Sequence, residues 1–267
     1  MSPTEIVGIL EIIYVILLGL VFGSFATMLA HRGHIFTRNA DKEQNGEGMR
    51  SCCPHCKTKM KVIDLVPVFS WLLQRGKCRY CAKSISRTYP AIELSVLLMG
   101  LMYFYMHGFT PVSQTMAAYA AFSILIALAV FDFRHKILPN NLVATLGVVG
   151  LFYRFWPSHF DVVFSAQIFE YGGGALVYAL VVFLIGLFMH KILGRQALGM
   201  GDVKFFAVAG LWLGLSKFAL FCIFSGVFGV FLGLFWKKFK KEDRFPFGPA
   251  LILSFFVLLL LGSSHLL

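Results

Sequence analysis

Two aspartates stand at the ends of apolar segments, where a charged side chain usually has a function. Asp132 follows the apolar run 113–131, and Asp202 precedes the run 203–216, directly after a Gly-Met-Gly sequence. Two carboxylates that lie together share one proton, so one can activate a water molecule as a general base while the other protonates a carbonyl oxygen. We therefore predict that Asp132 and Asp202 are a catalytic pair.

Each aspartate also has an ordinary structural explanation. Asp202 is typical of a helix N-cap, and Asp132 can pair with Arg134 at the membrane interface. Two such residues on one membrane face favour the catalytic interpretation, especially since one follows a G-x-G turn whose glycines let the backbone bend. The sequence holds no G-x-S-x-G and no HExxH motif that would predict another hydrolytic centre.

Four cysteines form two C-x-x-C pairs, Cys53 with Cys56 and Cys78 with Cys81, separated by 21 residues. Two such knuckles can close a tetrahedral structural Zn2+ site of four thiolates. The competing interpretation is two disulfides, which a reducing cytosol disfavours. Cys52 is a spare thiol that could replace Cys53 as a ligand.

The elements that must position these residues are membrane helices. Of the 267 residues, 58% are hydrophobic and only 14% are charged, and the apolar residues come in runs of nearly bilayer-spanning length. The sequence predicts an all-α polytopic membrane protein with about eight transmembrane helices. The expected spans are 6–30, 90–106, 113–131, 141–156, 167–190, 203–216, 218–236 and 247–264. Merging the two that flank Lys217 would leave seven.

This division gives three parts: a first transmembrane helix at 1–30, a small zinc-knuckle domain at 31–89 and a transmembrane core at 90–267 that carries both aspartates. With eight spans, all Lys and Arg residues except Arg154 and Lys217 fall on one side of the membrane. The positive-inside rule makes that side cytosolic, together with both aspartates and all four metal cysteines. The net charge of +11 then reflects topology and attraction to anionic lipid, not binding of nucleic acid.

The apolar segment 64–73 between the knuckles has two interpretations of equal weight. It can lie on the membrane surface with Trp71 at the headgroup level, or it can form a small hydrophobic core over the metal. Glu93, near the start of the second span, can be a polar contact between helices or a contact to substrate, and we favour the former. The GxxxG pairs Gly19–Gly23 and Gly229–Gly233 are interpreted as packing surfaces, and the first of them is also a candidate surface for a substrate helix.

The chain resembles the type IV prepilin peptidases over nearly its whole length. The resemblance is carried by Gly23-Ser24-Phe25 with His31-Arg32, by 53–94 with its Ser70-Trp71-Leu72 and Tyr89-Pro90, by Asp132 with Ile137-Leu138-Pro139, by Gly199-Met200-Gly201-Asp202-Val203-Lys204, and by Phe245-Pro246-Phe247-Gly248-Pro249. The departures are few. Thr27 stands where the family usually has Asn, Asn140 where it usually has Asp, and near Asp64 the family usually has Asn or a similar polar residue.

The resemblance implies a GxGD aspartyl endopeptidase of the bacterial inner membrane, with Asp132 and Asp202 as its catalytic residues. Its substrates would be type IV prepilins or the pseudopilins of type II secretion, cut after a Gly that ends a short basic leader. The family also implies methylation of the new N-terminus with S-adenosylmethionine.

The alternative from another class is a proton-coupled transporter in which Asp132 and Asp202 relay protons. It predicts inverted repeats, which the sequence does not show, and it gives the four cysteines no role. A zinc-bearing membrane scaffold without enzymatic activity would explain the metal site but not the paired carboxylates.

Overall fold

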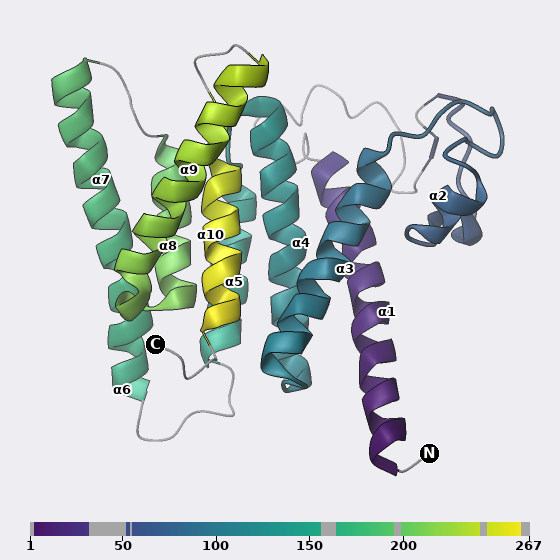
Figure 1. The fold of residues 1–267 in the computed structure, drawn as a ribbon, viewed down its shortest axis with the longest axis horizontal. Helices are drawn as coiled ribbons and strands as arrows, with labels where there is room; N and C mark the ends of the chain where they lie inside the picture. The colour runs from purple at the N-terminus through teal and green to yellow at the C-terminus, as the bar shows by residue number, and fades with distance from the viewer. Residues whose placement is uncertain are drawn as a thin grey trace. The chain divides into compact units, whose positions relative to one another are not determined.

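The computed structural model describes residues 3–31, 52–53, 55–155, 164–194, 199–240 and 245–262 (Figure 1). Over these residues the chain is helical, and its only strand-like pairing consists of two isolated antiparallel bridges, Cys52 with Lys59 and Lys77 with Ser84. The predicted all-α membrane fold is therefore confirmed. The stretch 32–50 of the expected cytosolic domain lies outside the described residues. The chain divides into two compact units, residues 1–105 and 106–267, and each is described by itself.

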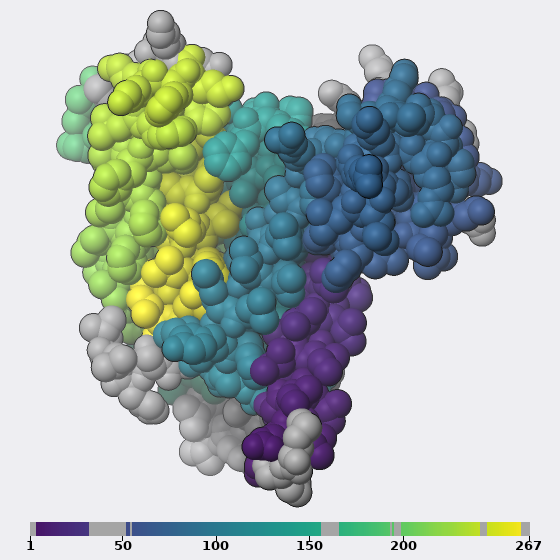
Figure 2. All heavy atoms as spheres, turned by 45° about the vertical axis from the view of Figure 1, so that its right-hand side comes forward, coloured from purple at the N-terminus to yellow at the C-terminus, as the bar shows by residue number. Residues whose placement is uncertain are grey.

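The first unit contains two long apolar helices and a small subdomain between them in sequence. The helices are α1 (Pro3–His31) and α3 (Thr88–His107), and the subdomain carries η3 (Val62–Leu65) and α2 (Phe69–Leu73). We call the described residues 52–87 the metal subdomain. In Figure 2 it forms a lobe (blue) beside the C-terminal part of α1 (purple).

Helices α1 and α3 touch through glycines. A Cβ atom on Gly19 would lie 3.0 Å from the Cα of Leu97, and a Cβ on Gly23 would lie 2.9 Å from the Cα of Glu93. Backbones approach this closely only where a side chain is missing. The predicted packing role of Gly19 and Gly23 is confirmed, but the suggestion that they bind a substrate helix is wrong, because α3 already occupies that surface.

The second unit is a helical bundle. Its elements are α4 (Val112–His135), α5 (Asn140–Phe155), α6 (Phe164–Gln167), the π-helical turn η5 (Ile168–Gly172), α7 (Gly173–Leu193), α8 (Met200–Leu213), η6 (Leu215–Lys217), α9 (Phe218–Lys240) and α10 (Gly248–Leu261). Helix α4 is the most deeply buried of the candidate spans. Small residues let its neighbours approach, and Ala118 and Ala121 are fully buried.

Close contacts fix α8 between α5 and α7. The indole nitrogen of Trp212, which is fully buried, donates to the carbonyl oxygen of Leu146 on α5. On the other side, a Cβ on Gly210 would lie 2.5 Å from the carbonyl oxygen of Gly174 on α7. The run of three glycines at 172–174 thus belongs to helix packing, in agreement with the expectation that it is no nucleotide loop.

Three charged side chains form hydrogen bonds with backbone groups at helix ends. They lie at the end of the second unit where α8 stops. Arg154 donates to the carbonyl oxygen of Trp212, Lys217 donates to that of Leu258 at 3.5 Å, and Glu170 accepts from the backbone N–H of Ser216 at 2.9 Å. Cations at C-terminal carbonyls and a carboxylate at free N–H groups compensate the unpaired backbone groups of helix ends. Arg154 and Lys217, the two basic residues assigned to the extracytosolic side, therefore have structural partners.

The helices follow the expected spans closely. Within the described residues, five are long and apolar enough to cross a membrane: Thr4–His31, Thr88–His107, Val112–His135, Ile168–Ile192 and Leu215–Lys240. Helices α5, α8 and α10 coincide with the other three expected spans, but they have only 14 to 16 residues, so a count of eight spans stays a prediction. The expected break near Lys217 is confirmed, since Gly214 with φ +83° ends α8.

Candidate active site and metal cluster

Asp132 lies in the last turn of α4 and is buried, with 5% of its surface exposed. Its Oδ2 accepts a hydrogen bond of 2.7 Å from the backbone N–H of Gly248, the first residue of α10. The donor is therefore a helix N-terminus, which favours a negative charge, and not the exposed Arg134. A Cβ on Gly248 would lie 2.8 Å from the same oxygen, so a side chain at this position would displace the carboxylate.

Asp202 lies in the first turn of α8 and is half-buried. Its Oδ2 accepts from the backbone N–H of Gly199 at 3.2 Å. Gly199 is the N-cap, so Asp202 occupies the third helical position and reaches back to the cap. Asp202 thus helps to start the helix, as expected, but as its third residue and not as its N-cap. The hydrogen bond holds the carboxylate at the N-terminal end of α8.

Leu138 packs against the N-terminal ends of two helices, α8, which carries Asp202, and α10, whose Gly248 binds Asp132. It packs against Gly201, whose Cβ would lie 3.2 Å from the Cβ of Leu138, and against Gly248, whose Cβ would lie 3.1 Å from its Cδ2. Both aspartates adjoin these contacts, Asp132 through its hydrogen bond to Gly248 and Asp202 as the residue that follows Gly201. The structure therefore places both predicted site residues in one region of the second unit.

A polar link fastens the α4–α5 connection to α8. Lys204 Nζ donates to Asn140 Oδ1 at 2.9 Å. Asn140 is the second residue after Leu138, and Lys204 is the second residue after Asp202.

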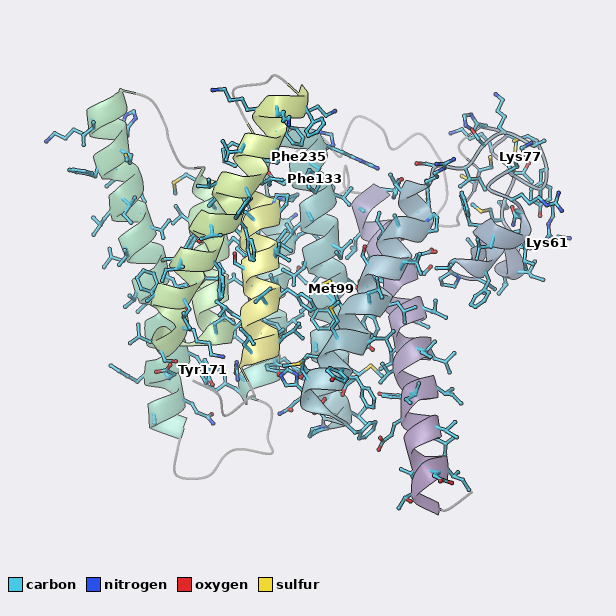
Figure 3. The ribbon with its side chains drawn as sticks, in the orientation of Figure 1. Lys61, Lys77, Met99, Phe133, Tyr171 and Phe235 are labelled. Carbon is cyan, nitrogen blue, oxygen red and sulfur yellow. The ribbon has the colours of Figure 1, made fainter. Side chains whose placement is uncertain are left out.

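Figure 3 shows where this end of the unit lies: Phe133, the neighbour of Asp132, is near one end of the bundle, and Tyr171 is near the other. Tyr171 faces Arg154, whose guanidinium lies 4.3 Å from the ring centroid. The aspartates and the Arg154 cluster thus occupy opposite ends.

The four predicted metal cysteines cluster in the first unit. The Sγ atoms of Cys53, Cys56, Cys78 and Cys81 all lie within 4.8 Å of one another, and all four are free thiols. The disulfide alternative is therefore not what the structure shows. Cys52 instead pairs its backbone with Lys59 in one of the isolated bridges. This removes the ambiguity between Cys52 and Cys53.

The two knuckles repeat the same local geometry. In one, Lys57 N–H donates to the carbonyl oxygen of Cys53, and in the other Ala82 N–H donates to that of Cys78, both at 2.9 Å. Lys57 and Ala82 both have positive φ, 58° and 55°. Each tight turn presents two thiols on the same side, which is the arrangement that a pair of C-x-x-C ligands needs.

The pKa values of two of these thiols are shifted in opposite directions. Hydrogen bonds from Thr58 are the largest effect on Cys56 and lower its pKa to about 6. A backbone hydrogen bond from Lys83 opposes the shift at Cys81, but desolvation and the neighbouring thiols raise that pKa to about 11. A thiol whose pKa is lowered, such as Cys56, more easily forms the thiolate that binds a metal ion.

Asp64 organises the metal subdomain, a role that sequence reasoning missed. Its buried carboxylate accepts from Lys61 N–H, from Gln74 Nε2 and from the hydroxyl of Tyr80, and it pairs with Arg79 Nε at 3.3 Å. The last two partners lie between Cys78 and Cys81, so Asp64 ties the second knuckle to η3 and α2. The sequence offered one indication of this role, because Asp64 is the only acidic residue of the segment 52–87.

Trp71 and Glu93 also make hydrogen bonds within or to the metal subdomain. Trp71 donates from Nε1 to the carbonyl oxygen of Ile85 and packs against Gly76. Leu72 and Leu73 beside it are exposed, so the segment 64–73 does not form the hydrophobic core over the metal that one of the two interpretations predicted. Glu93 of α3 accepts from the backbone N–H of Val68 at 2.6 Å. The predicted polar contact of Glu93 thus exists, but it joins a membrane helix to the metal subdomain and not two membrane helices.

The matches to known protein families agree with the division of the chain into the two units 1–105 and 106–267. Residues 17–107 match the family model of the bacterial peptidase A24 N-terminal domain, and residues 119–234 match that of the type IV leader peptidase family. No solved structure matches the chain.

Curated relatives match over most of their length. A prepilin leader peptidase/N-methyltransferase of Stutzerimonas stutzeri is 29% identical over 99% of this chain and 96% of its own. Proteins of the same name from Aeromonas hydrophila and Legionella pneumophila are 30% and 31% identical, over 94% and 80% of this chain and 90% and 73% of their own. With this identity and coverage, the chain belongs to the type IV leader peptidase family.

Proposed function

We propose that this protein is a membrane-embedded aspartyl endopeptidase that removes the short basic leader from type IV prepilins or pseudopilins, cutting after a Gly. The observation that carries the proposal is the placement of Asp132 and Asp202 at one end of the second unit, around Leu138 and Gly248. The names of the relatives supply the substrate class. Membership of a peptidase family disfavours the transporter alternative.

In the proposed mechanism the two carboxylates share one proton. Both carboxylates accept a backbone N–H, but the hydrogen bond at Asp132 is the shorter, 2.7 Å against 3.2 Å at Asp202, so we assign the shared proton to Asp202. Asp132 then removes a proton from the attacking water molecule, and Asp202 donates its proton to the oxygen of the scissile carbonyl. Burial of Asp132 keeps bulk water from competing for this base.

We propose Zn2+ as the occupant of the cysteine cluster. Four thiolates at the usual Zn–S distance around a tetrahedral ion lie about 3.8 Å apart, and the Sγ atoms of Cys53 and Cys81 are 3.9 Å apart. The four residues Cys53, Cys56, Cys78 and Cys81 would hold the ion. A site closed by four protein ligands has no position for substrate, so its role is to fix the subdomain.

Methylation of the new N-terminus is the second proposed activity, because the relatives carry N-methyltransferase in their name. S-adenosylmethionine would supply the methyl group, and we assign no residues to its site. For localisation we propose the bacterial inner membrane, with the aspartates and the metal subdomain on the cytosolic side.

The direct test uses the purified chain in detergent with a prepilin from the same genome. Mass spectrometry of the product should show a cut after the Gly that ends the leader, and a substrate with Val in place of that Gly should stay intact. A protein that leaves both substrates whole but moves protons across a vesicle membrane would be the transporter.

A further inference from the structure

A group of apolar side chains is exposed on the metal subdomain. They come from η3 and α2, and their exposed fractions are Val62 85%, Leu73 80%, Ile63 56%, Leu72 56% and Phe69 54%. We call these five residues the η3–α2 apolar face. Neighbouring exposed apolar side chains on a small subdomain usually mark a surface that is covered in the working protein.

This face lies at the level of the first turns of α3. Val68, between η3 and α2, donates its N–H to Glu93 of α3. Glu93 lies five residues beyond Thr88, which is about 7.5 Å along the helix at 1.5 Å per residue. Figure 1 shows α2 at the height of the N-terminal part of α3. Because α3 is itself a candidate membrane span, its first turns lie towards one end of that span, and the contact between Val68 and Glu93 brings the face to their level.

The charges around the face suit an anionic surface. Lys61 directly precedes η3 and Arg75 follows α2, and both are exposed. In Figure 3, Lys61 lies level with α2, whereas Lys77 lies higher on the subdomain. Asp64, the only acidic residue of the segment 52–87, is buried and paired with Arg79. The face therefore meets a negative surface without repulsion, as basic interfacial helices do.

We propose that the η3–α2 apolar face inserts into the boundary between headgroups and acyl chains of the anionic bilayer that holds α1 and α3. Glu93 sets the depth of this insertion through Val68, and Lys61 and Arg75 contact the lipid phosphates. The insertion fixes the metal subdomain on the membrane surface. A basic prepilin leader would be repelled by the same two cations, so lipid is the occupant that the charges favour.

Photocrosslinking to lipid tests the proposal. Benzoylphenylalanine replaces Leu73 in the full-length protein, which is reconstituted with zinc into vesicles of phosphatidylethanolamine and phosphatidylglycerol. The matched control carries the probe in place of Lys77. Mass spectrometry should find lipid adducts at position 73 and few or none at position 77. Adducts at position 73 to a second copy of the chain or to an added prepilin, or equal lipid labelling at both positions, would overturn the proposal.

A charge variant tests the lipid chemistry. Combining Lys61→Ser with Arg75→Ser should lower lipid labelling at position 73 several-fold in the anionic vesicles and leave it unchanged in phosphatidylcholine vesicles. Retained zinc in the variant shows that the subdomain is folded. Labelling that is the same in both vesicle types before and after the substitutions contradicts a role for the two cations.

Discussion

The carboxylate of Asp132 accepts a hydrogen bond from the backbone N–H of Gly248 across 116 residues of sequence, at 2.7 Å. This contact joins the C-terminal end of α4 to the N-terminal end of α10. It explains why the FPFGP sequence belongs to the site although it contains no side chain that can transfer protons. Gly248 supplies a donor and leaves room for the carboxylate.

Gly248→Ala is therefore expected to reduce cleavage strongly. The new methyl group would stand 2.8 Å from Asp132 Oδ2 and would push the carboxylate out of position. Misplacing a catalytic group by about 1 Å costs on the order of 100-fold in rate. The measurement is kcat/KM on a prepilin in detergent. Gly226→Ala is the matched control, because a Cβ on Gly226 meets nothing within 4 Å, and it should cleave normally.

Zinc is expected to depend on Cys53, Cys56, Cys78 and Cys81 and not on Cys52. Cys81→Ser should lower the zinc content of the purified protein, since three thiolates bind the ion far less tightly than four. Cys52→Ser should keep one zinc per chain, because Cys52 lies in a backbone bridge with Lys59. Metal analysis of both variants checks this. Equal loss of zinc in the two would mean that the ligand set is wrong.

Asp64 is expected to stabilise the metal subdomain through its acceptor oxygens. Asp64→Leu removes the contacts to Gln74, Arg79 and Tyr80, and a hydrogen bond typically contributes about 0.5–1.5 kcal/mol to stability. Asp64→Asn keeps one acceptor oxygen and should be much milder. Zinc release by a chelator should be fast in the Leu variant and close to that of the unchanged protein in the Asn variant. The reverse order would refute this role of Asp64.

The orientation of the membrane helices is open to a direct test. The charge distribution predicts that a reporter fused after Lys240 lies in the cytosol and that one fused after Ser158 lies on the opposite side. Alkaline phosphatase and fluorescent protein fusions give opposite signals on the two sides. A fusion after Lys240 that reports the extracytosolic side would favour seven spans, against the helix break at Gly214.

Local patterns in the sequence predicted the parts of this structure that depend on local chemistry. The apolar runs predicted the helices, and the C-x-x-C spacing predicted that the four cysteines from Cys53 to Cys81 cluster. The partners of single polar groups were not predictable, because they come from segments far apart in sequence. Glu93 and Val68, and Asp132 and Gly248, meet only after the helices have packed. The assignment of Gly19 and Gly23 to substrate failed for the same reason, since the α3 surface that covers them has no sequence signal.

The most direct test of the catalytic assignment is the cleavage rate of Asp132→Asn and Asp202→Asn. An amide can neither accept the proton of the water molecule nor donate the shared proton, so each variant should lose cleavage of a prepilin by several orders of magnitude. Both proteins should keep their zinc and, if methylation is present, should still methylate a substrate that has already been cut. If either variant cleaves at a rate near that of the unchanged protein, Asp132 and Asp202 are not the catalytic pair.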